Sequence, residues 1–148
     1  MTIINSIDYH DYVIKDVQLI GEFDQMYRNS QAVPWHQDKQ EDKLDIRLTL
    51  ELLKEYSPFD YICDLGCGLG YFLDQMKRIL GLETTRLVGY DISPACCKKG
   101  KSLFSKMDFH ELDLMAINHV ISKKKIVDHY TARKEIICPQ RDSLVCFS

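Results

Sequence analysis

The sequence predicts an α/β domain built on a doubly wound, mostly parallel sheet. Strand-like and helix-like segments alternate over residues 59–114, in the order strand, glycine-rich turn, helix, strand, helix, strand. An acidic residue also stands at or near the end of each strand segment, namely Asp64, Asp91 and Asp113. Because parallel strands end at the same edge of a sheet, we expect these three carboxyl groups to line one crevice.

Length and composition favour a single domain. The chain has 148 residues, 45% of them hydrophobic, which suits one core. We expect one domain over residues 1–148, with a cap region over 1–37, a cofactor-binding core over 38–114 and an atypical tail over 115–148. The formal net charge of −3 gives no reason to expect a nucleic-acid or membrane partner.

The chain is expected to be cytoplasmic. Its apolar runs are shorter than the roughly 20 residues that span a bilayer, and its N-terminus lacks the basic start and apolar centre of a secretion signal. The six cysteines form no C-x-x-C pair with zinc spacing. We therefore expect free, mostly buried thiols and no metal site.

The first helix is expected after an irregular, aromatic-rich N-terminal segment. Asp38 can cap it together with Glu41, and Ser57-Pro58 ends it after Tyr56. Its expected apolar face comprises Leu44, Leu48, Leu52 and Leu53.

The remaining elements follow from local signals. The near-continuous apolar segment 59–65 suits a central parallel strand. Apolar residues at helical spacing over 72–80 predict a helix that ends at Gly81. A second strand is expected over 86–91, and Ser93-Pro94 can start a helix that runs to about Phe104. Alternation of apolar and polar residues over 107–114 predicts a third strand.

Three glycines at alternate positions, Gly66, Gly68 and Gly70, follow the first strand. Glycine permits backbone dihedrals closed to other residues and lets a ligand touch the backbone. Asp91, 25 residues after Gly66, ends the next strand, where its carboxylate can accept hydrogen bonds from both hydroxyls of a ribose. The pattern predicts a cofactor that contains a nucleoside.

The glycine spacing disfavours a dinucleotide. The dinucleotide fingerprint is G-x-G-x-x-G, whereas this chain has G-x-G-x-G and places Tyr71 where the third glycine would stand. A nicotinamide-dependent oxidoreductase is therefore the weakest of the functions considered.

In these motifs the chain resembles the class I S-adenosylmethionine-dependent methyltransferases, whose fold is Rossmann-like. The resemblance implies that the turn "DLGCGLG" contacts the amino acid part of S-adenosylmethionine and that the acid of "LVGYDIS" binds its ribose. It also implies that the acid ending the third strand lies near the adenine, with a backbone group of the next residue. The implied cofactor site is Asp64, Gly66, Cys67, Gly68, Gly70, Asp91, Ile92, Asp113 and Leu114.

The N-terminal segment "FDQMYRNSQAVPW" is similar to the cap of methyltransferases that act on amines of sugars or natural products. The likeness implies that Tyr27 and Trp35 close over the cofactor. Ordinary packing against the sheet is the other interpretation of these two residues. Asp64 also has an alternative role, which is only to stabilise the turn through hydrogen bonds with backbone amides.

The resemblance covers about Phe23 to Leu114, and 34 residues follow it. We therefore expect a sheet that is incomplete in its C-terminal half. The tail holds two short strand candidates, "EIIC" and "SLVCF". An uncovered apolar strand edge invites pairing. Either the tail improvises the missing strand, or a second chain supplies it as a homodimer or a partner subunit, or the protein is only marginally stable.

The expected function is S-adenosylmethionine-dependent methyl transfer to a small molecule with an amine or hydroxyl acceptor. Such transfer needs mainly in-line positioning of the acceptor, and no residue is singled out as a catalytic base. The alternative is a truncated, non-catalytic methyltransferase-like protein that serves as a binding module or scaffold.

Overall fold

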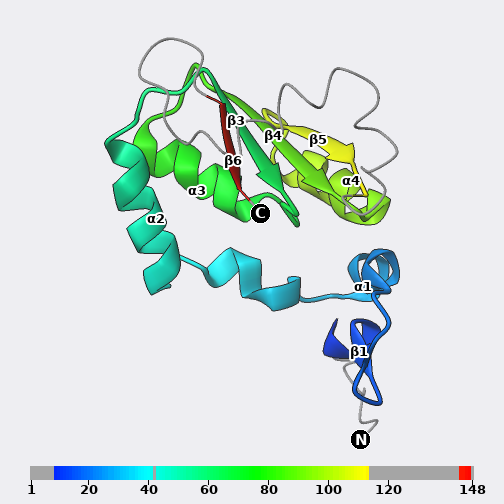
Figure 1. Ribbon diagram of the computed structural model, residues 1–148. Helices are drawn as coiled ribbons and strands as arrows, with labels where there is room; N and C mark the ends of the chain where they lie inside the picture. The colour runs from blue at the N-terminus through cyan, green and yellow to red at the C-terminus, as the bar shows by residue number, and fades with distance from the viewer. Residues whose placement is uncertain (1–8, 42, 114–143, 148) are drawn as a thin grey trace, which may run out of the picture.

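A four-stranded parallel sheet forms the centre of the chain (Figure 1). The structure is a computed structural model and describes residues 9–41, 43–113 and 144–147. The strand order is β5-β4-β3-β6. The strands are β3 (Tyr61–Leu65), β4 (Arg86–Asp91), β5 (Asp108–Glu111) and β6 (Leu144–Phe147). The predicted Rossmann-like parallel α/β fold is confirmed.

The central strand is β3, as its apolar character predicts. Four of its five residues are buried, and it pairs in parallel with β4 on one flank and with β6 on the other. The tail segment "SLVCF" therefore supplies β6, and the flank of β3 is covered from within the chain. The other tail candidate, "EIIC", and Leu114 lie outside the described residues.

Two helices follow the strands as predicted. Helix α3 (Tyr71–Leu80) begins directly after the glycine turn and ends at Gly81, which adopts a left-handed φ of 65°. Helix α4 (Pro94–Leu103) begins after Ser93, whose hydroxyl oxygen accepts a hydrogen bond from the Cys96 N–H at 3.0 Å. The C-terminal end of α3 and the N-terminal end of α4 are each marked by residues that act on near neighbours in the sequence. This is why both ends were predicted accurately.

The prediction for the first long helix was wrong in its start and, apart from Leu53, in its buried face. Helix α2 (Leu44–Lys54) has Lys43 at its N-cap and no side-chain cap, whereas Pro34–Lys39 forms a 3₁₀ helix, η2. The expected apolar residues Leu44, Leu48 and Leu52 are exposed by 68%, 56% and 62%. The buried residues are Leu50 and Leu53, because α2 contacts the rest of the chain mainly through α3. Periodicity alone did not reveal which side of the helix would meet that neighbour.

The N-terminal segment forms a second, smaller core beside the sheet. It contains the 3₁₀ helix η1 (Tyr9–Tyr12), the antiparallel strands β1 (Ile14–Lys15) and β2 (Gln18–Leu19), and helix α1 (Phe23–Asn29). Helix α1 lies against α4, and its Met26 and Tyr27 are buried with Leu69 and Cys96. None of the helices within the described ranges is long and apolar enough to cross a membrane.

Candidate functional site

The glycine turn and the end of β4 meet at one edge of the sheet. The backbone N–H groups of Gly66 and Cys67 donate to the Tyr90 carbonyl oxygen at 2.8 and 3.0 Å. The Gly68 N–H donates to Asp91 Oδ2 at 3.0 Å. The structure therefore brings Asp91 into direct contact with the turn, as the sequence predicts.

Asp91 is held from several sides but keeps acceptor capacity. Its side chain is buried, and it also accepts the Ser93 N–H through Oδ1 at 2.9 Å. Burial raises the pKa of Asp91, while the backbone groups of Ser93, Gly68 and Ile92 oppose that rise. A carboxylate offers about four acceptor positions, and the Gly68 and Ser93 amides occupy two of them at hydrogen-bond distance, so two remain for further donors. The Ile92 side chain is half exposed.

The three glycines of the turn differ in what a Cβ atom at their position would meet. Gly66 has a φ of 80° and nothing within 4 Å of the position of a Cβ atom, so its backbone is open. At Gly68 a Cβ atom would lie 2.0 Å from Gln37 Nε2, and at Gly70 it would lie 2.6 Å from the Phe109 ring. The expected bare backbone is thus present at Gly66, while Gly68 and Gly70 admit close neighbours.

Gln37 is a site residue that sequence reasoning missed. Its Oε1 accepts the Leu69 N–H at 2.9 Å, and its Nε2 donates to the Tyr27 hydroxyl at 3.5 Å. Gln37 comes from η2, where Trp35 and His36 adopt positive φ values of 53° and 51°. A single glutamine in an irregular segment carries no pattern that could have identified it.

Tyr27 and Trp35 both take part in packing. Tyr27 is 3% exposed, and burial raises the pKa of its hydroxyl group, which therefore stays protonated. The Trp35 ring lies 5.6 Å from that of Tyr9 and 6.2 Å from those of Phe23 and Tyr27. These contacts form the second core, and closure over a cofactor remains a proposal for both residues.

Asp64 is buried in β3 without holding the turn. Burial, followed by the nearby charge of Asp91, raises the pKa of Asp64 to about 7. In residues 9–41, 43–113 and 144–147 no hydrogen bond to its carboxyl group is formed, and the turn amide of Gly68 goes to Asp91 instead. A carboxyl group that changes charge near neutral pH therefore lies beneath the turn.

Cys67 packs inward while its backbone stays in the turn. The side chain is buried, and a Cβ atom on Gly89 would lie 2.6 Å from its sulfur atom. Burial raises the pKa of the Cys67 thiol. Cys96 and Cys97 are likewise free and buried, and Cys63 is buried, as expected. Within the described ranges, His, Cys, Asp and Glu form no cluster that could hold a metal ion.

Asp113 follows the third strand at the rim of the site. It is exposed, two residues beyond the end of β5. The Leu112 N–H donates to the Asp91 carbonyl oxygen at 2.9 Å, which brings this end of the chain beside the β4 terminus. Two predicted acids, Asp64 and Asp91, therefore lie close to the turn, and the third, Asp113, directly follows the residue that contacts the β4 terminus.

Comparison with known proteins supports the predicted resemblance. No protein-family model matches the chain. The chain is 30% identical over 120 residues to the carboxy-S-adenosyl-L-methionine synthase of Wolinella succinogenes, which confirms the resemblance to S-adenosylmethionine-dependent enzymes. The match covers 78% of this chain and 47% of that enzyme, so the chain spans about half the length of its curated relative.

Two solved structures overlap with part of the chain. The plantazolicin methyltransferase BpumL, in a complex that contains SAH, is 26% identical with a TM-score of 0.42 and covers 53% of this chain and 32% of its own. The PH0226 protein of Pyrococcus horikoshii is 23% identical with a TM-score of 0.43, and the corresponding shares are 60% and 42%.

Proposed function

We propose that this chain binds S-adenosylmethionine between the open backbone of Gly66 and the carboxyl group of Asp91. The observation that carries the proposal is the contact of Asp91 with the turn, because it leaves a carboxylate with spare acceptor positions beside bare backbone. The match to an enzyme of S-adenosylmethionine chemistry supports the same ligand.

Each residue of the site has a proposed part in holding the cofactor. Asp91 accepts the ribose hydroxyls, and the ionised form of Asp64 attracts the ammonium group of the amino acid part. The turn lets the ligand approach its backbone. The remaining proposed contacts with the cofactor are Cys67, Gly68, Gly70, Ile92, Asp113, Leu114, Tyr27 and Trp35.

The proposed reaction is methyl transfer to a small molecule with an amine or hydroxyl acceptor. The cofactor supplies an activated methyl group when it is bound. The chain's part is to bind and orient, and correct orientation alone can lower a barrier by about 7–11 kcal/mol. The cap segment around Tyr27 and Trp35 would then exclude water from the site.

A second candidate is a methyltransferase-like binding module without catalysis. It is favoured by the observation that the contact of Asp91 with the turn and the open backbone of Gly66 suffice for binding alone. In that case the cofactor pocket is retained and no acceptor is methylated. Affinity for the cofactor without turnover on any acceptor would distinguish this function from the first.

Calorimetry of the purified chain with S-adenosylmethionine and with its demethylated product tests the proposal. We expect saturable binding of both, with one site per chain. A folded chain that binds neither ligand would contradict the proposal. Carboxy-S-adenosyl-L-methionine is a useful third ligand, because the curated relative is named for its synthesis. A mass measurement in solution tests the further proposal that the chain forms a homodimer or binds a partner subunit.

Affinity for S-adenosylmethionine is expected to depend on pH through Asp64. The pKa of this carboxyl group is about 7 in the free protein. Below pH 7 the carboxyl group is therefore mostly protonated and uncharged, and it no longer attracts the ammonium group of the ligand. Affinity should therefore fall by up to about tenfold per pH unit below pH 7 and level off above it. Calorimetry at pH 6, 7 and 8 measures this change.

Two controls isolate the contribution of Asp64 to this pH dependence. Asp64→Asn should weaken binding at pH 8 and flatten the dependence between pH 6 and pH 8. The ligand 5′-methylthioadenosine has no amino acid part and should bind the original chain with nearly equal affinity across this range. Equal affinity of the original chain for S-adenosylmethionine at pH 6 and pH 8 would contradict the assigned role.

A further inference from the structure

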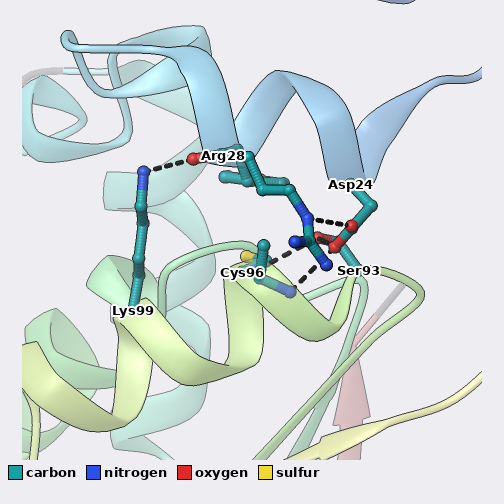
Figure 2. Close-up of polar contacts among 7 residues, drawn as sticks. Asp24, Arg28, Ser93, Cys96 and Lys99 are labelled. Atoms are coloured by element: carbon teal, nitrogen blue, oxygen red, sulfur yellow. Dashed lines mark hydrogen bonds and ion pairs between the residues drawn. The ribbon is translucent and has the colours of Figure 1, made fainter.

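Helix α1 is fastened to the start of helix α4 by Asp24 (Figure 2). Asp24 Oδ1 accepts the Ala95 N–H at 2.8 Å and the Ser93 hydroxyl at 2.9 Å. Its other oxygen, Oδ2, pairs with Arg28 Nε at 2.5 Å. A side chain about 70 residues away in the sequence therefore contacts the helix that follows the site.

These contacts complete the cap of α4. The first turn of a helix leaves N–H groups without partners. Pro94 has no N–H, the Cys96 N–H donates to the Ser93 hydroxyl, and the Ala95 N–H donates to Asp24. A negative charge is favoured at this end of a helix. Accordingly, the pKa of Asp24 is lowered, first by the Ala95 hydrogen bond and then by Arg28.

Ser93 extends the contact to the site. Its side chain is fully buried, its hydroxyl donates to Asp24, and its backbone N–H donates to Asp91 Oδ1 at 2.9 Å. The other oxygen of Asp91 accepts the Gly68 N–H. Hydrogen bonds therefore run without a break from the cap helix through Ser93 and Asp91 to the glycine turn.

A second contact holds the other end of α1. The Lys99 ammonium group of α4 donates to the carbonyl oxygen of Tyr27, and Figure 2 shows Lys99 extending from α4 toward α1. Helix α1 is thus attached to α4 by one polar contact near its start and another near its end. Of the two, only the contact through Asp24 continues to Asp91.

We propose that Asp24 is a positioning residue that couples docking of the cap helix to the orientation of Asp91. The proposal rests on the proposed function, in which Asp91 binds the cofactor. Because coupling between two sites is reciprocal, ligand binding at Asp91 stabilises the docked position of α1, and a docked α1 strengthens ligand binding. Asp24 itself does not touch the ligand.

The test compares Asp24→Asn with Asp74→Asn. Both variants remove an Asp–Arg ion pair at spacing i, i+4, since Asp74 pairs with Arg78 at 2.9 Å, but only Asp24 contacts Ser93. Asp24→Asn should weaken S-adenosylmethionine binding about tenfold, because its amide oxygen accepts the Ala95 and Ser93 hydrogen bonds without the negative charge that strengthens them, and Asp74→Asn by less than about twofold. Equal affinities of the two variants would overturn the proposal.

Hydrogen exchange separates this proposal from the proposed function. In the absence of ligand, the Gly68 and Ser93 amides should exchange faster in Asp24→Asn than in Asp74→Asn, because both amides donate to Asp91. Equal exchange rates would overturn the coupling even if the cofactor binds. If the original chain does not bind the cofactor, the proposed function fails, while faster exchange still supports the positioning role.

A second variant keeps the test valid if Asp24→Asn does not fold. Ser93→Ala removes the hydroxyl that donates to Asp24 and leaves the Asp24–Ala95 hydrogen bond in place. It should also speed exchange of the Gly68 amide. In the double variant Asp24→Asn/Ser93→Ala, the change in the exchange of the Gly68 amide should be smaller than the sum of the changes in the two single variants. Both substitutions act on the same series of hydrogen bonds. Full additivity would overturn the proposal.

Discussion

Replacing Asp91 with asparagine is expected to weaken S-adenosylmethionine binding by at least about 100-fold, if the proposed function holds. The carboxylate would accept two ribose hydroxyls, and each hydrogen bond to a charged group contributes about 1.5–3 kcal/mol. The substitution also points an amide NH₂ group at one of two backbone donors, the N–H of Gly68 or that of Ser93. Calorimetry of the folded variant measures the loss.

A matched control separates the site from general charge effects. Asp45 lies in the first turn of α2 and is exposed, so Asp45→Asn removes the same charge away from the crevice. The affinity of Asp45→Asn for S-adenosylmethionine should equal that of the original chain. If Asp91→Asn keeps its fold by circular dichroism and binds S-adenosylmethionine with unchanged affinity, the proposal that Asp91 binds the ribose is contradicted.

Gly70→Ala is expected to lower the free energy of unfolding by about 2–5 kcal/mol. One part of the loss is the left-handed backbone, with φ at 89°, which costs about 1–2 kcal/mol for a residue with a Cβ atom. The other part is overpacking, about 1–3 kcal/mol, because the new atom would lie 2.6 Å from the buried ring of Phe109. Denaturant unfolding measures the sum.

Gly66→Ala provides the comparison for this prediction. Gly66 has a similar φ of 80° but open space at the Cβ position, so only the backbone cost of about 1–2 kcal/mol applies. The difference between the two variants isolates the contact of the turn with Phe109. Equal losses in both variants would show that the ring moves aside without cost.

The sheet and its following helices could be predicted because their signals are local. The glycines after β3, the Ser93-Pro94 cap and the terminal Gly81 each act through neighbours within a few residues. The start and the buried face of α2 could not be predicted in this way. They depend on η2, whose positive φ values at Trp35 and His36 have no sequence signature, and on the side from which α3 approaches.

The sequence by itself determined the parallel α/β order, the glycine turn and the acids at the strand ends, since dihedral preference and apolar spacing are properties of short segments. The tertiary structure alone decided which side chains meet that turn. Gln37 lies 32 residues from Leu69, and Asp24 lies 69 residues from Ser93. Such contacts depend on how α1 and η2 pack against the sheet's edge, and no local preference encodes the partner of a hydrogen bond that closes so long a loop.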